Sequence, residues 1–209
     1  MNRRSALAAR GVVLAAALLS PPHISAQAPA MVDLLVRVFD GLQEVTLDCH
    51  ISVYPATSRD TALAAAPHED GWAHVDVPAG FYDLQVARRN GDGAVALAWA
   101  ERLSVLRYSD EAGQHREIIN LQPGFGALLV HPPLSWASAD LTWQVGVFLH
   151  SGVGRAGFAP TEADTVPRVF VLPTGRYDLA GHTGDVHVSV TDVEIPARQT
   201  RMAVLPEPR

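Results

Sequence analysis

The sequence predicts an all-β protein that consists of two small β-sandwiches in tandem. Apolar and polar residues alternate over many short segments, and turn residues separate these segments. Beyond the N-terminal segment, no stretch of useful length has the apolar period of a helix. The phrase "VPAGFYDL" at residues 77–84 returns almost unchanged as "VLPTGRYDL" at residues 171–179. Such a repeat indicates two copies of one module.

The N-terminal segment has the composition of a secretory signal peptide. Three arginines precede an apolar run that ends at Leu19, and small residues surround Ala26. The run is too short to anchor the chain in a bilayer. We expect cleavage after Ala26, so that residues 1–26 form the signal peptide. The mature chain is then secreted or periplasmic and has no transmembrane anchor.

The first module is expected over residues 31–122, where apolar alternation runs between turn pairs such as Asp40-Gly41 and Asp70-Gly71. A polar, alanine-rich stretch before Asp70 has room for one helical turn. In chain order, the predicted strands cover residues 34–39, 46–55, 72–78, 81–89, 94–108 and 115–121.

The second module is expected over residues 126–206, and the junction lies near "QPGFG". Aligning the two copies pairs "VRVFDG" with "VGVFLHSG", "NGDG" with "HTGD" and "ERLSVL" with "TDVEIP". The predicted strands cover residues 125–131, 141–150, 166–173, 176–181, 186–197 and 200–206.

The repeated phrase has a physical explanation at the corner between two strands. Proline cannot donate a hydrogen bond to the sheet, and glycine permits the reversal that follows, at Gly80 and at Gly175. Tyr82 and Tyr177 are expected to bury their rings and bond their hydroxyls to nearby backbone, as in a tyrosine corner. The aspartate after each tyrosine is expected to point outward or to cap the turn.

This pattern resembles the prealbumin-like, or transthyretin-like, sandwich of carboxypeptidase regulatory-like domains and of PEGA-type repeats in bacterial envelope proteins. The resemblance covers residues 36–121 and 145–205, and its most specific parts are residues 70–84 and 171–179. It implies accessory, adhesive or scaffolding modules that are mostly non-catalytic, and it brings no catalytic residues to this chain.

Composition excludes several other functions. The net charge of −6, without a basic cluster, argues against a nucleic-acid partner. The chain has no lysine, which rules out lysine-based catalysis. Cys49 is the only cysteine, so an internal disulfide cannot form. In "LDCHISV" it alternates with Leu47 and Ile51 on one strand face, and we interpret it as a small core residue.

No catalytic constellation emerges from the residue types. Ser151 and His150 are neighbours on a predicted strand and therefore point to opposite faces. No nucleophile elbow or phosphate-binding glycine loop is present, so we favour a non-enzyme without a cofactor.

Histidines at two predicted hairpins are weak candidates for a zinc or copper site, because side chains across a turn can converge. Neither set has the spacing of a known zinc motif. The candidate ligands are His68 and His74 at one hairpin and His182, Asp185 and His187 at the other. A small metal-dependent enzyme therefore remains one alternative.

A carbohydrate-binding module is a second alternative, because exposed tryptophans can stack on sugars. Trp136 lies in a predicted loop and is the best candidate for an exposed ring. Trp72, His74 and Asp76 share one strand face and are further candidate binding residues, whereas Trp99 and Trp143 have core patterns.

The preferred hypothesis is an exported, non-catalytic binding or scaffolding protein of the bacterial cell envelope. Its partner would be another envelope or surface protein, or a polysaccharide. The long irregular segments at residues 57–70 and 152–166 are the places where such a partner is expected to bind.

Overall fold

The computed structural model describes residues 31–106, 113–150 and 157–209, so the predicted signal peptide lies outside the described residues. The prediction of an all-β sandwich fold is confirmed: nearly every regular element is a strand. None of the helices in the described part of the chain has the length and apolar character needed to cross a membrane.

The first sandwich comprises the strands from β1 to β9. One of its sheets has the order β5-β6-β1, with β9 on the other side of β1 and β2 paired to the end of β1. The opposite sheet has the order β4-β3-β7-β8. The strands are β1 (Met31–Asp40), β2 (Gln43–Glu44), β3 (Cys49–Pro55), β4 (Leu63–Ala64), β5 (Ala66–Pro67), β6 (Ala73–Pro78), β7 (Gly80–Arg89), β8 (Val95–Val105) and β9 (Gln114–Asn120).

The second sandwich comprises the strands from β10 to β15, in two sheets of order β12-β10-β15 and β11-β13-β14. It also contains the short helix α1 (Leu134–Ser138). The strands are β10 (Phe125–His131), β11 (Gln144–Leu149), β12 (Arg168–Pro173), β13 (Gly175–Thr183), β14 (Val186–Ile195) and β15 (Thr200–Val204).

The pairing pattern is the same in both sandwiches. β1 is antiparallel to β6 and parallel to β9, and β10 is antiparallel to β12 and parallel to β15. The sheet order thus matches β1 with β10 and β3 with β11. The alignment of "VRVFDG" with "VGVFLHSG" is therefore wrong, because the first lies in β1 and residues 145–149 of the second lie in β11.

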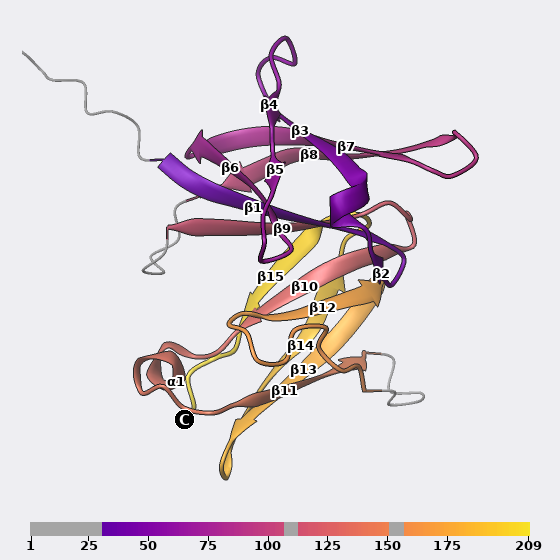
Figure 1. Ribbon diagram of the computed structural model, residues 1–209. Helices are drawn as coiled ribbons and strands as arrows, with labels where there is room; N and C mark the ends of the chain where they lie inside the picture. Colours follow the sequence, from indigo (N-terminus) through magenta and orange to yellow (C-terminus); the bar gives the residue numbers. More distant parts are fainter. Residues whose placement is uncertain (1–30, 107–112, 151–156) are drawn as a thin grey trace, which may run out of the picture.

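The four sheets are stacked as four layers, with a hydrophobic core between each pair of neighbours (Figure 1). The middle core joins the two sandwiches. Leu35 of β1 and Ile118 of β9 pack there against Leu129 of β10 and Val169 of β12. β1 and β10 are therefore buried on both faces, which explains their nearly continuous apolar sequences "DLLVRVF" and "GALLVH".

At the edge of this middle core, hydrogen bonds join β9 of the first sandwich to β15 of the second and to the residues just before it. The Ile118 amide donates to the Thr200 hydroxyl over 2.6 Å, and the Thr200 amide donates to the buried carboxylate of Glu117 over 2.8 Å. The Asn120 amide at the end of β9 donates to the Arg198 carbonyl over 3.4 Å. The last strand of one sandwich is thereby fastened to the last strand of the other.

Three local expectations are corrected. Residues 46–48 form a 3₁₀ turn, so the strand begins at Cys49 and Leu47 is 71% exposed. The alanine-rich stretch forms the short strands β4 and β5 in place of a helical turn. Trp99 lies on the outer face of its sheet, because the neighbouring Ala98 and Ala100 face the core.

Candidate functional site

The two copies of the repeated phrase form the same corner. The Tyr82 hydroxyl donates to the Pro78 carbonyl over 2.7 Å, and the Tyr177 hydroxyl donates to the Pro173 carbonyl over 2.8 Å. Both rings are buried, and this burial raises the pKa of each phenol. These tyrosines therefore stabilise the fold and do not form a binding surface.

The aspartate after each tyrosine fastens a bulge in the neighbouring strand. Asp83 accepts a hydrogen bond from the Arg102 amide, and Asp178 accepts one from the Asp192 amide. Arg102 and Asp192 both have positive φ, and the strand register shifts beside both aspartates. At each bulge one backbone amide has no hydrogen-bond partner in the neighbouring strand, and the aspartate carboxylate accepts its hydrogen bond instead.

Cys49 is half-buried against the first core, and its thiol donates to the Val45 carbonyl. Burial raises the pKa of this thiol to about 11, although nearby Arg88 opposes the shift. The thiol is therefore protonated at neutral pH and is a poor nucleophile.

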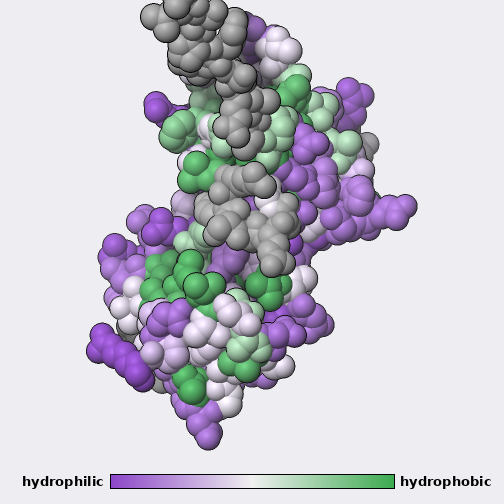
Figure 2. Space-filling view, turned by 90° about the vertical axis from the view of Figure 1, so that its left-hand side faces the viewer, coloured by the Kyte–Doolittle hydropathy of each residue, from purple (hydrophilic) through white to green (hydrophobic). Residues whose placement is uncertain are grey.

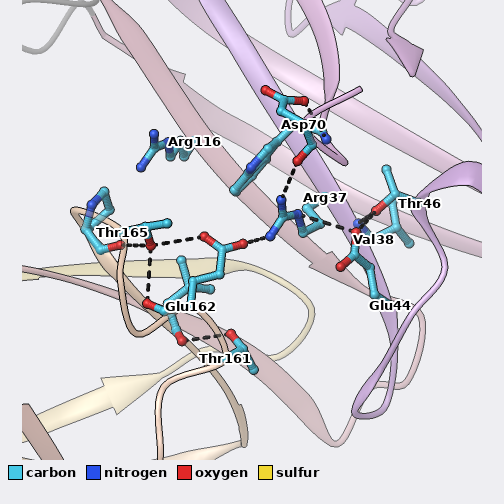
Figure 3. A network of polar contacts seen from close by, with 12 residues as sticks. Arg37, Val38, Glu44, Thr46, Asp70, Arg116, Thr161, Glu162 and Thr165 are labelled. Carbon is cyan, nitrogen blue, oxygen red and sulfur yellow. Dashed lines mark hydrogen bonds and ion pairs between the residues drawn. The ribbon is translucent and has the colours of Figure 1, made fainter. Parts of the chain in front are cut away.

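The outer face of the first sandwich meets the second sandwich at a polar junction centred on Arg37 (Figure 3). Arg37 is ion-paired with Glu162, which lies in the segment before β12, and donates to the Asp70 carbonyl over 3.1 Å. The residue is only 8% exposed, and burial lowers the pKa of its guanidinium. Asp70 and Glu162, which belong to the two predicted loop segments 57–70 and 152–166, thus both bind the buried guanidinium of Arg37.

Trp72 lies beside Arg37 in this junction. The Arg37 guanidinium is 4.2 Å from the centre of the Trp72 ring, and the Arg116 guanidinium is 5.8 Å from it. Arg116 also donates to the Val166 carbonyl over 2.9 Å. Because Trp72 is only 5% exposed, its ring packs the junction and offers no surface for a sugar.

A groove of about 390 Å³ opens next to Arg116, between β9 and the second sandwich. Gln114, Arg116 and His131 contribute its polar atoms, while the remaining lining is apolar. Leu134, Val166 and Val204 line the groove and are 73%, 55% and 59% exposed. Hydrophobic side chains gather on the side of the molecule that carries α1 (Figure 2).

The structure brings the first pair of candidate metal ligands together. The ligand atoms of His68, Asp70 and His74 lie within 4.8 Å of one another. His74 Nε2 is 3.0 Å from the Asp70 carboxylate, and His74 Nδ1 is 3.2 Å from both carboxylate oxygens of Asp33. Asp76 lines a shallow hollow with His74 and Asp33.

The second set of candidates forms a different arrangement. The rings of His182 and His187 stack with centres 5.6 Å apart on the β13–β14 hairpin. Asp185 lies in the intervening turn. In the described part of the chain, no group of three metal-ligating side chains includes these residues. Ser151 lies outside the described residues.

The exposed position expected for Trp136 is wrong. Trp136 belongs to α1 and is 2% exposed, because its ring packs into the core between the two sheets of the second sandwich. The outward-facing tryptophan is Trp99, whose ring centre is 5.7 Å from that of Tyr54. The Arg59 guanidinium lies 4.4 Å from the Trp99 ring centre and covers part of it.

The sequence interpretation missed the junction residues Arg37, Arg116 and Glu162. One signal was present: Arg37 interrupts an otherwise apolar strand, "LLVRVF", which is unusual for a strand buried on both faces. Nothing in the sequence indicated that the segment containing Glu162 would reach it.

Fold and site define this chain as an all-β sandwich protein with an apolar groove at the junction of two sandwiches. No known family matches the sequence, and no curated protein matches it significantly. Among solved structures, it is similar to the Bacillus anthracis TIE protein, with 10% identity, a TM-score of 0.30 and coverage of 84% of this chain and 34% of the other. The chain thus spans about a third of that structure.

Two Bacteroides ovatus structures are also similar. A candidate adhesin has 12% identity and a TM-score of 0.30, covering 85% of this chain and 90% of the other. A candidate cell adhesion protein has 10% identity and a TM-score of 0.27, covering 87% and 98%.

Proposed function

We propose that this chain is an exported, non-catalytic binding or scaffolding protein of the bacterial cell envelope, and that its partner occupies the junction groove. The observation that carries the proposal is the groove itself. Concave, mostly apolar sites with a few polar groups at the contact between two domains are common binding sites. Export rests on the N-terminal segment with the composition of a signal peptide.

The proposal includes a tandem repeat of one carboxypeptidase regulatory-like, PEGA-type module, over residues 31–122 and 126–206. Three features support it: the shared strand order, the paired tyrosine corners, and the paired aspartate-fastened bulges. A bulge at the same place in two sandwiches is a specific feature, since bulges are retained where they shape a strand.

The chemistry of the groove favours a protein partner. Its exposed lining is aliphatic, from Leu134, Val166 and Val204. Aliphatic side chains of a partner would be buried there. Stacking on a sugar instead requires open aromatic faces.

A polysaccharide ligand would use another surface. The outward pair Tyr54 and Trp99, with the Arg59–Glu101 ion pair beside it, is the best aromatic surface in the described residues. This second candidate predicts that added glycans change the fluorescence of Trp99, and that Trp99→Ala removes the change.

The experiment compares co-purification of two variants after crosslinking in the native envelope. Leu134→Glu places a charge in the groove, and Leu42→Glu places the same charge at a turn remote from it. Leu134 and Leu42 are 73% and 69% exposed, so neither change should disturb a core.

We expect a recurrent partner with the native chain and with Leu42→Glu, and loss of this partner with Leu134→Glu. Equal recovery with both variants would refute binding in the groove. Absence of any recurrent partner with the native chain would refute the binding function.

A further inference from the structure

We propose that His68, Asp70 and His74 bind a divalent transition-metal ion of the zinc type. The residues come from the turn between β5 and β6 and from β6 itself, where their ligand atoms lie within 4.8 Å of one another. This site does not depend on the junction groove or on any partner there.

The separations of the ligand atoms suit a single small ion. His74 Nε2 is 3.0 Å from Asp70 Oδ2, and His68 Nδ1 is 3.4 Å from Asp70 Oδ1. Zinc–ligand bonds of about 2.0–2.1 Å in a tetrahedron place ligand atoms about 3.3 Å apart. Both separations are close to this value, although they involve the two different oxygens of Asp70. With one ligand atom from each residue the atoms lie within 4.8 Å of one another, so the side chains would draw closer around an ion.

A second carboxylate orients His74. Both oxygens of Asp33 lie 3.2 Å from His74 Nδ1, which directs the proton of the neutral ring to that nitrogen. The lone pair of Nε2 then faces Asp70, and a cation between them removes the repulsion. Metal-binding histidines usually donate the N–H of their other ring nitrogen to a carboxylate, a backbone carbonyl or a water, and Asp33 can serve as such a carboxylate.

The turn holds the ligands before an ion arrives. The His68 amide donates to the Trp72 carbonyl over 2.8 Å, and the Trp72 amide donates to Asp70 Oδ1 over 3.0 Å. Gly71 has a φ of +81°, a conformation that glycine allows at this tight turn.

The types of ligand also determine which metals the site would bind. Two imidazole ligands favour zinc, copper or nickel over calcium or magnesium.

The test is a titration of the full chain, purified without a polyhistidine tag and stripped with chelator, using zinc chloride and calorimetry. We expect saturable binding of one ion per chain. His68→Ala and His74→Ala should each weaken it at least tenfold, and Asp33→Asn should weaken it about 10–100-fold through the orientation of His74. Cobalt absorption provides a readout of tetrahedral geometry.

His187→Ala is the matched control, because His187 is an exposed hairpin histidine that lies next to another histidine. It should leave zinc affinity unchanged. His68 is largely exposed, so His68→Ala tests the site even if His74→Ala does not fold. Absence of saturable binding to the native chain, or equal affinity in His68→Ala and the native chain, would overturn the proposal.

Discussion

The side chains of Tyr82 and Tyr177 show how a residue pattern becomes a stabilising contact. Each ring fills a core while its hydroxyl bonds a backbone carbonyl four residues earlier. This arrangement could be predicted, because Pro-small-Gly-x-Tyr places the phenol directly over the corner. The partners of Asp83 and Asp178 could not be predicted, because bulges of β8 and β14 supply the amide groups.

Replacing either corner tyrosine by phenylalanine should lower the free energy of unfolding by about 1–2 kcal/mol, because a buried carbonyl loses its donor. Urea denaturation of Tyr82→Phe and Tyr177→Phe measures this effect. Tyr54→Phe is the control, since the Tyr54 hydroxyl makes no hydrogen bond within the described residues. A similar decrease in the free energy of unfolding for Tyr54→Phe would show that the hydrogen bonds of Tyr82 and Tyr177 are not the cause.

The ion pair of His150 with Asp178 should make stability depend on pH. The hydrogen bond that the His150 ring donates to the Asp178 carboxylate raises the pKa of His150 and lowers the pKa of Asp178. His150 therefore contributes fully to the stability of the fold below its ordinary pKa of about 6.5. This stabilisation is lost as pH rises through the higher pKa that His150 has in the folded chain. The stabilisation from Asp178 is present above about pH 4 and is lost as pH falls through the lowered pKa of this carboxyl.

We expect His150→Gln to lower the melting temperature at about pH 5.5 and to have little effect at about pH 8.5. Arg59→Gln is the control at the corresponding aspartate, Asp83, because arginine keeps its charge throughout this range. Its effect should be the same at both pH values. A pH-independent effect of His150→Gln would disprove the coupling.

At the scale of elements, alternation and turn pairs predicted most strands, because these signals are local. β3 starts later than predicted, since Leu47 continues the apolar pattern although the chain turns there. Trp99 faces outward because Ala98 and Ala100 on either side of it face the core, and periodicity alone does not show which of the two faces is buried. The helix α1 was missed because five residues are too few for a periodic signal.

Gly126 in β10 marks a close approach that the sequence does not show. A Cβ atom at this position would overlap the carbonyl oxygen of Pro196. Gly126→Ala should therefore destabilise the chain by about 2–3 kcal/mol or more. Gly124→Ala is the matched control, because no atom lies within 4 Å of its added Cβ, and it should change stability by less than about 0.5 kcal/mol. Equal stability of the two variants in urea would contradict the close contact between Gly126 and the Pro196 carbonyl.

At the scale of the whole molecule, the junction of the sandwiches decides where a partner can bind. The outer faces of two sheets bury the middle core, and the remaining border of this contact forms the groove. The sequence does not reveal which outer faces meet, because Leu35 and Leu129 look like ordinary core residues. The groove could therefore be found only from the structure, whereas the fold class and the corner residues could be predicted.

Photo-crosslinking in the native envelope tests the proposed binding in the groove most directly. A photoreactive amino acid would replace Val204, which lines the groove, or Val186, which lies on the remote β13–β14 hairpin; both are exposed, by 59% and 42%. We predict a discrete crosslinked partner from position 204 and none from position 186. A crosslink from position 186 alone, or equal crosslinks from both, would contradict binding in the groove.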